Sequence, residues 1–187
     1  MNRMEVEVKA RVKDMVSLKK KLESMGARFG EEVEQTDEYF KQKGFDSRPE
    51  GPGSWIMRIR ESGGSKTLTF KSLTEVTGAW NEHETGIEDG DEARKILQSM
   101  GLINVFTLHK KRVHGSMAGF EVLLDDVKEL GRFMEVALDA SDRDKEMARE
   151  RIIRFIKETG IKENDIEKRG YGEIMGERMG HKFHGMR

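Results

Sequence analysis

The stretch Met-Glu-Val-Glu-Val-Lys-Ala-Arg-Val, residues 4–12, alternates apolar and charged residues with a period of two. This period is typical of a β-strand, in which successive side chains point to opposite faces. One face would carry Glu5, Glu7, Lys9 and Arg11, and the other face would be apolar. The same division into a charged face and an apolar face recurs in nearly every later strand. This recurrence favours an arrangement in which the charged faces of the strands are turned toward one another. We therefore expect an antiparallel barrel closed around a polar, charged lumen.

The later strands are interrupted by three amphipathic segments with helical spacing, which we expect to pack outside the barrel. The sequence Ser-Gly-Gly-Ser, residues 62–65, is a hairpin signal between two of the strands. Further strands are expected at residues 31–42, 55–61, 66–72, around 82–84, 102–114, 119–127 and 132–139, with a turn at 115–119. The helices are expected from Asp14 to Gly26, from Asp89 or Asp91 to Gly101, and over Asp142–Thr159 with Ser141 as its N-cap.

Composition limits the class of protein. The chain has 187 residues and is 35% hydrophobic, enough for one sizeable core. We expect a single domain over residues 1–175 and a Gly-, Met- and His-rich flexible tail over 176–187. Lys plus Arg (34) and Asp plus Glu (35) nearly cancel, so no net field favours nucleic acid or an anionic membrane. Without cysteine or a long apolar run, the predicted setting is cytoplasmic, with no membrane partner.

A face that holds both signs of charge has a specific chemical use. Arginine binds phosphate oxygens as a bidentate fork and lysine binds them as a point charge. Carboxylates on the same face would repel a polyphosphate unless a hard cation such as Mg²⁺ or Mn²⁺ stood between them. The mixed face therefore predicts a site for a divalent metal together with a phosphate compound.

Several short motifs carry a resemblance to the CYTH superfamily, and within it to class IV adenylate cyclases. The likeness runs from residue 4 to about residue 175. The motifs are Glu5-x-Glu7-x-Lys9, Thr36-Asp37-x-Tyr39-Phe40, Met57-Arg58-Ile59-Arg60, Leu68-Thr69-Phe70-Lys71, Lys110-Lys111-Arg112, Leu124-Asp125-Asp126-Val127, Leu130-Gly131-x-Phe133-x-Glu135 and Tyr171. The resemblance implies an α+β fold: a closed eight-stranded antiparallel tunnel that binds triphosphates with a divalent metal.

By position, the resemblance also implies roles for individual residues. The implied phosphate ligands are Lys9, Arg58, Arg60, Lys71, Lys110 and Arg112, of which Lys9, Arg60, Lys71 and Arg112 would also be catalytic. The implied metal ligands are Glu5, Glu7, Asp125 and Glu135, and weaker candidates are Glu82, Glu84 and Glu121. The family often ends its last strand with Glu-x-Glu, whereas this chain has Glu135-Val136-Ala137, so one carboxylate is missing. Asp139 lies two residues on, about 6.6 Å further along the strand.

Three functions follow as alternatives. The first is an adenylate cyclase-like enzyme that converts ATP to cyclic AMP and pyrophosphate with Mg²⁺ or Mn²⁺. The second is an inorganic or thiamine triphosphatase, which uses the same charged residues but directs water at the terminal phosphorus. The third is a binding module that holds a triphosphate without turnover. In each case the partner is a small triphosphate compound and the protein is a monomer or a homodimer.

Overall fold

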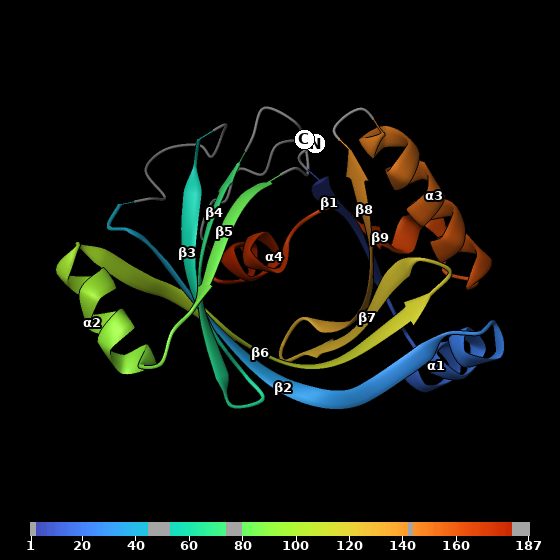
Figure 1. Cartoon of the computed structure of the whole chain (residues 1–187), viewed down its shortest axis with the longest axis horizontal. Coiled ribbons are helices and arrows are strands. Elements are labelled where there is room, and N and C mark those ends of the chain that lie inside the picture. The colour runs from blue at the N-terminus through green and yellow to red at the C-terminus, as the bar shows by residue number, and fades with distance from the viewer. Residues whose placement is uncertain (1–2, 45–52, 74–79, 142–143, 181–187) are drawn as a thin grey trace. The chain divides into compact units, whose positions relative to one another are not determined.

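The structure is a computed structural model, and it describes residues 3–44, 53–73, 80–141 and 144–180 (Figure 1). The chain divides into two compact units. Unit 1 comprises Met1–Val33 and Lys110–Lys168, and unit 2 comprises Glu34–His109 and Arg169–Arg187. Two long strands, β2 (Arg28–Gln42) and β6 (Leu102–Met117), contribute residues to both units.

Unit 1 is a set of antiparallel strands with helices on its apolar face. Its core contains Val8, Leu124 and Val136 from the strands and Leu22 and Ile152 from the two helices. The strands are β1 (Arg3–Arg11), β7 (Phe120–Val127), β8 (Gly131–Ser141) and the short β9 (Ile166–Glu167). The helices are α1 (Met15–Ser24), α3 (Lys145–Glu158) and the 3₁₀ turn η2 (Glu163–Asp165).

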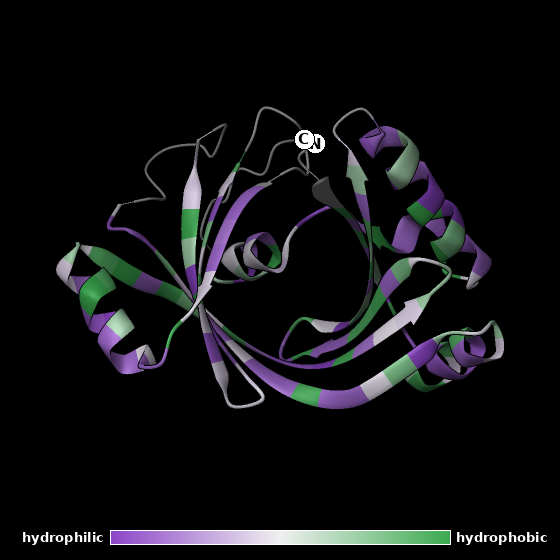
Figure 2. Cartoon of the chain, in the orientation of Figure 1, coloured by the Kyte–Doolittle hydropathy of each residue, from purple (hydrophilic) through white to green (hydrophobic). Residues whose placement is uncertain are grey.

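Unit 2 repeats this construction with a different set of elements. Its core joins Phe40 and Ile59 of the strands to Ala93 and Leu97 of one helix. The strands are β3 (Trp55–Ser62), β4 (Ser65–Leu73) and β5 (Trp80–Gly86), and the helices are α2 (Gly90–Ser99) and α4 (Tyr171–Arg178). Hydrophobic and hydrophilic residues alternate along the strands, as the charged and apolar faces require (Figure 2).

The sheet differs from the expected closed eight-stranded tunnel. Within the described residues it has nine strands in the order β5-β4-β3-β2-β6-β7-β8-β1-β9. Among the strands that the structure describes, the outermost ones, β5 and β9, do not pair with each other, so hydrogen bonds between these strands do not close the sheet. The ninth strand arises because the chain after α3 returns to β1, where Glu167 pairs with Lys9 and Ile166 with Ala10. This short pairing covers backbone groups of β1 that an edge strand would leave exposed.

Two predicted helix caps are confirmed and one is wrong. Asp14 Oδ1 accepts a hydrogen bond from the Ser17 backbone N–H at 3.0 Å, and Asp89 caps α2 in the same way. Ser141 is not the cap of α3, because it is still part of β8, where it pairs with Arg3. The cap position is Asp144, whose carboxylate accepts a hydrogen bond from the Ser141 hydroxyl at 2.5 Å.

The two glycine-rich turns have different outcomes. The hairpin at residues 62–65 is confirmed, with Gly63 and Gly64 both at positive φ between β3 and β4. The turn expected at 115–119 is shorter, because β6 continues to Met117. Gly115 is a strand residue whose absent side chain makes room for the Phe29 ring. The turn itself is at residues 118–119.

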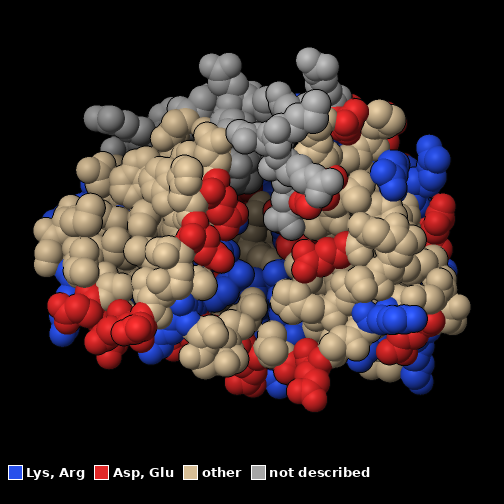
Figure 3. All heavy atoms as spheres, viewed as in Figure 1, with Lys and Arg blue, Asp and Glu red and all other residues tan. Residues whose placement is uncertain are grey.

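Basic and acidic side chains are intermixed on the face of the molecule drawn in Figure 3. This mixture agrees with the formal net charge of −1. No helix in the described part of the chain has the length and the apolar character needed to cross a membrane.

Candidate functional site

In unit 1, the charged face predicted for residues 4–12 is confirmed and extends across the neighbouring strands. Lys9 of β1 lies opposite Glu135 of β8, and Phe133 of β8 lies opposite Asp125 of β7. Asp125 in turn lies opposite Arg112 of β6. Directly paired residues of an antiparallel ladder share one face. Side chains from four strands are therefore collected on one surface.

Four of these residues form a buried ion-pair cluster, which we call the unit 1 cluster: Lys9, Arg112, Asp125 and Glu135. Arg112 donates two hydrogen bonds to Asp125, each 2.6 Å long, and Lys9 Nζ is 2.9 Å from Glu135 Oε2. Arg112 also approaches Glu135 at 3.5 Å. Each of the four residues is at most 7% exposed. Buried charges of this kind persist only when they are paired, so the cluster holds its cations in fixed positions.

In the ion pair between Lys9 and Glu135, the attraction of opposite charges shifts each pKa more than burial does. Burial alone would lower the pKa of Lys9, but attraction to Glu135 and then Glu7 outweighs it and raises the pKa. Burial alone would raise the pKa of Glu135, but the charges of Lys9 and Arg112 outweigh it and hold the pKa far below the ordinary range. At neutral pH, Lys9 is therefore cationic and Glu135 is anionic.

The predicted metal ligands do not all fit a metal equally. The part of the chain that the structure describes contains no group of three or more His, Asp or Glu side chains close enough to hold a metal ion. Glu7 and Glu135 carry carboxylate oxygens, the ligand type that Mg²⁺ and Mn²⁺ prefer. Glu135 Oε2 lies 2.9 Å from Lys9 Nζ and its Oε1 lies 3.5 Å from Arg112, so a metal at Glu135 would compete with these two cations. Asp125 does not fit, because both its oxygens accept hydrogen bonds from Arg112. For Glu5, the structure gives only the backbone position, opposite Asp139.

The position of the missing carboxylate lies between two glutamates. Ala137 pairs with Glu7 on one side and with Glu121 on the other. Cβ atoms of directly opposite residues are about 4.5–5.5 Å apart, so the Cβ atoms of both glutamates lie close to the Cβ atom of Ala137. Glu121, a weaker candidate from the sequence, thus lies on the same row as Glu7. His114 Nδ1 lies 3.4 Å from Glu121 Oε1.

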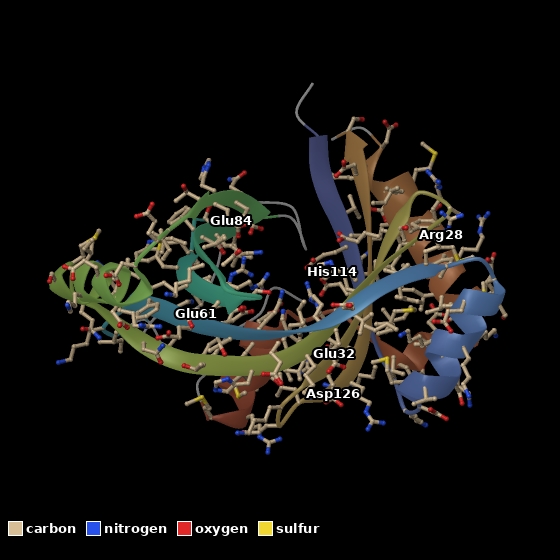
Figure 4. All side chains as sticks on the ribbon, turned by 60° about the horizontal axis from the view of Figure 1, so that its bottom comes forward. Arg28, Glu32, Glu61, Glu84, His114 and Asp126 are labelled. Carbon is tan, nitrogen blue, oxygen red and sulfur yellow. The ribbon has the colours of Figure 1, made fainter. Side chains whose placement is uncertain are left out.

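Unit 2 carries a second charged face built from its own strands. Asp37 of β2 pairs with Arg60 of β3, and the next row on this face joins Tyr39, Arg58 and Thr69. Glu84 of β5, labelled in Figure 4, lies opposite Thr69. The remaining predicted residues, Lys71 and Glu82, lie opposite each other on β4 and β5.

The cations of the unit 2 face are also held by carboxylates. Arg60 donates two hydrogen bonds to Asp37, at 2.6 and 2.7 Å, and Asp37 is fully buried. Lys71 Nζ is 2.6 Å from Glu82 Oε2. Arg58 donates through its NH2 group to Thr69 and Glu84, at 3.0 and 3.1 Å. Its Nε is buried and has no hydrogen-bond partner among the described residues, so this donor is available to a ligand.

The predicted phosphate ligands are distributed over the two units: Lys9, Lys110 and Arg112 belong to unit 1, and Arg58, Arg60 and Lys71 belong to unit 2. That they all line one common tunnel stays a prediction. Three further features of this face were not predicted from the sequence: the pairing of Asp37 with Arg60, the hydroxyl of Thr69 and the buried Lys41. The alternation of β2 was a signal for two of them, because Asp37 and Lys41 share the parity of Tyr39.

Lys41 has an unusual environment for a lysine. It is 6% exposed, and burial lowers its pKa to about 8, although attraction to Glu173 of α4 opposes this shift. Between pH 8 and the ordinary lysine value of 10.5, the unfolded chain holds this proton and the folded chain does not. Stability contributed by this group is therefore gained as the pH rises through that window.

We expect the substitution Lys41→Met to remove this pH dependence. In the wild-type protein, the free energy of unfolding should gain on the order of 1–3 kcal/mol between pH 8 and pH 10.5 from this group. The variant should lack that gain and should be more stable than the wild type at neutral pH. Urea unfolding at several pH values measures both effects. Lys43→Met, at an exposed position two residues away, should keep the wild-type profile; a Lys41→Met profile parallel to it would contradict the assignment.

Comparisons with known proteins bear on the family and the fold of this chain. The CYTH domain family model matches residues 3–171. A Methanocaldococcus jannaschii protein named "Putative adenylate cyclase" is 28% identical over 176 residues, covering 92% of this chain and 99% of that protein. The solved structure of the PH1012 protein of Pyrococcus horikoshii has a TM-score of 0.78 and 26% identity, covering 91% and 98% of the two chains.

A third comparison supports the fold alone. The structure of a Hippeastrum adenylyl cyclase-like protein, described as having a dominant triphosphatase activity, has a TM-score of 0.64 and 16% identity. It covers 96% of this chain and 96% of its own.

Proposed function

Because this chain belongs to the CYTH domain family, we propose that it is a metal-dependent enzyme that acts on the triphosphate of a nucleotide, with cyclisation of ATP as the favoured reaction. The Methanocaldococcus relative supports the choice of reaction by its name. The phosphate ligands would be Lys9, Arg58, Arg60, Lys71, Lys110 and Arg112, with Lys9, Arg60, Lys71 and Arg112 acting on the reacting phosphates.

The observation that carries the proposal is the set of buried cations held in place by carboxylates. A buried arginine whose Nε lacks an acceptor, such as Arg58, is suited to an anionic oxygen. Lys9 and Arg112 are fixed by their ion pairs before any ligand arrives. Charges that are already in place need no reorganisation when negative charge develops on a leaving group.

The metal would be Mg²⁺ or Mn²⁺, held by Glu7 and Glu135 together with the substrate's phosphates, with Glu5 as a further ligand. Magnesium commonly keeps several waters and needs only one or two carboxylates when phosphates also bind. When bound, the ion would neutralise phosphate charge as the reaction proceeds. We do not assign a metal role to Asp125, which Arg112 occupies.

The reaction depends on which oxygen attacks. In cyclisation the ribose 3′-hydroxyl attacks the α-phosphorus, the bond to the bridging oxygen breaks, and pyrophosphate leaves as cyclic AMP forms. In triphosphatase action, water attacks the γ-phosphorus, the bond to the β–γ bridging oxygen breaks, and the diphosphate leaves as inorganic phosphate forms. Both reactions are accelerated mainly by positioning and charge stabilisation, so the same lysines and arginines serve either. Triphosphatase activity is the second candidate, and a neighbour with this fold is described as having it.

A product assay tests the proposal. Purified protein is incubated with ATP, thiamine triphosphate or tripolyphosphate and with Mg²⁺ or Mn²⁺, and cyclic AMP, pyrophosphate and phosphate are quantified. Cyclic AMP and pyrophosphate in equal amounts support the cyclase, whereas phosphate release supports the triphosphatase. If no compound turns over but tripolyphosphate still raises the melting temperature, the protein is a binding module instead.

The row Glu7–Ala137–Glu121 gives a prediction about the metal. Ala137→Glu would place a third carboxylate between two glutamates. Without metal, the like charges should lower the melting temperature; with Mn²⁺, the variant should be stabilised more than the wild type. Thermal unfolding in EDTA and across a Mn²⁺ titration separates the two effects. Ser99→Glu, at an exposed position on α2, is the control, and equal Mn²⁺ responses in the wild type and Ala137→Glu would show that position 137 does not face the ion.

A further inference from the structure

Gln35 of β2 carries a buried acceptor that nothing in the described chain satisfies. The side chain is 6% exposed, and its Nε2 donates a hydrogen bond to Ser62 Oγ at 3.1 Å. Its Oε1 has no hydrogen-bond partner among the described residues. The only other buried side-chain atom of this kind within that part of the chain is Arg58 Nε. Buried polar atoms are nearly always paired, so an orphan requires an explanation.

The two orphan atoms lie on the same face of unit 2. Gln35 has the parity of Asp37 and Tyr39, whereas Phe40 faces the apolar core on the other side. The pairs Gln35–Ser62 and Tyr39–Arg58 belong to the same ladder, four residues apart on β2. Four residues of strand span about 13 Å. An orphan acceptor and an orphan donor are thus separated along one charged face, with Arg60 between their rows.

A single ligand that pairs with both atoms needs a hydrogen-bond acceptor at one end and a hydrogen-bond donor at the other. Arg58 Nε requires an acceptor, which a phosphate oxygen supplies. Gln35 Oε1 requires a donor, such as an N–H group, and as part of a neutral amide it does not repel a phosphate chain as a carboxylate would. Tripolyphosphate carries no amino group, so it cannot satisfy Gln35 Oε1.

We propose that Gln35 Oε1 accepts a hydrogen bond from the amino group of a nucleobase, while the phosphates of the same nucleoside triphosphate lie at Arg58 and Arg60. This inference rests on the proposed function and narrows its substrate class. Gln35 selects an amino-bearing nucleotide over an inorganic triphosphate and over a nucleotide whose base lacks the group. A site built to pair with a ligand's polar group rejects the analogue that lacks it, because the buried partner is then left unsatisfied.

Calorimetric titration with Mg²⁺ present tests the inference with three ligands, and the product assay is run on each titrated sample to identify any turnover. The ligands are ATP, purine riboside triphosphate, which has hydrogen in place of the amino group, and tripolyphosphate. The wild-type protein should bind ATP about 5- to 30-fold more tightly than the analogue, the value of one buried hydrogen bond. Gln35→Met, which keeps the side chain's length but removes its polar group, should bind both nucleotides equally. Its affinity for tripolyphosphate should remain that of the wild type.

Gln42→Met is the matched control, because Gln42 lies on the same strand, is exposed, and has the opposite parity. It should keep the wild-type preference for ATP. Equal wild-type affinities for the two nucleotides, or an unchanged preference in Gln35→Met, would overturn the inference while binding of tripolyphosphate still supported the proposed function. If the wild type binds none of the three ligands, the proposed function fails as well.

A second measurement needs no substitution and remains informative if Gln35→Met does not fold. In ¹⁵N-labelled wild-type protein, the side-chain amide signal of Gln35 should shift when ATP is added. It should shift much less with tripolyphosphate or with purine riboside triphosphate. Equal shifts with all three ligands, or no shift with ATP, would overturn the role of Gln35.

Discussion

Replacing Arg112 with alanine is expected to lower the free energy of unfolding by about 3–5 kcal/mol, because it breaks a buried ion pair by removing one partner. Asp125 is fully buried, and each of its carboxylate oxygens accepts a hydrogen bond from Arg112. Without the guanidinium, a carboxylate would remain in the interior with its main counter-charge gone. Urea unfolding at neutral pH measures the loss.

The ion pair between Arg132 and Asp126, the residue that follows Asp125 on β7, supplies a matched control. Asp126, labelled in Figure 4, accepts a hydrogen bond from Arg132 at 3.3 Å, but both side chains of this pair are about half exposed. Arg132→Ala should therefore cost only about 0–1 kcal/mol. Similar losses in Arg112→Ala and Arg132→Ala would show that burial does not govern the cost of breaking these pairs.

A double substitution separates the cost of an unpaired charge from the value of the pair. Arg112→Met combined with Asp125→Leu removes both charges and keeps apolar volume. It should be more stable than Arg112→Ala alone, because no buried charge is left uncompensated. The double variant should nevertheless bind tripolyphosphate more weakly than the wild type, because it lacks a phosphate ligand.

Arg58→Lys is expected to weaken tripolyphosphate binding by about 10- to 150-fold, the equivalent of one charged hydrogen bond of about 1.5–3 kcal/mol. The substitution keeps the positive charge but removes the planar fork and the Nε donor that has no partner among the described residues. A loss of this size would therefore report the geometry of the guanidinium and not its charge. Calorimetric titration measures the affinity.

Arg94→Lys is the control for this experiment. Arg94 of α2 is also held by carboxylates, namely Glu38, Glu61 and Asp91, and it belongs to the same unit. It lies on the helix that covers the opposite, apolar face of these strands. The substitution should leave tripolyphosphate affinity unchanged. Equal losses in both variants would mean that the charged face of unit 2 is not where the phosphate binds.

The sequence by itself determined the features that depend on residues close together in the chain. The alternation in residues 4–12 gave the two faces of β1, because side-chain direction in a strand repeats every two residues. The caps at Asp14 and Asp89 and the Gly63–Gly64 hairpin followed from side chains and φ angles within one turn of chain. Family motifs extended this to the candidate phosphate and metal ligands, whose roles stay predictions.

Only the tertiary structure decided which charges meet. Arg112 pairs with Asp125 and Arg60 with Asp37 because strand register places them opposite each other. Register also places Ala137 between Glu7 and Glu121, and the return of the chain after α3 adds β9 to the sheet. The residue pattern of one strand predicts which side chains share a face. It does not predict which strand pairs with it or in which register. Burial of individual side chains is also decided by the tertiary structure. In the sequence, Lys41 and Gln35 have the character of exposed polar residues, but in the structure the surrounding elements bury both of them.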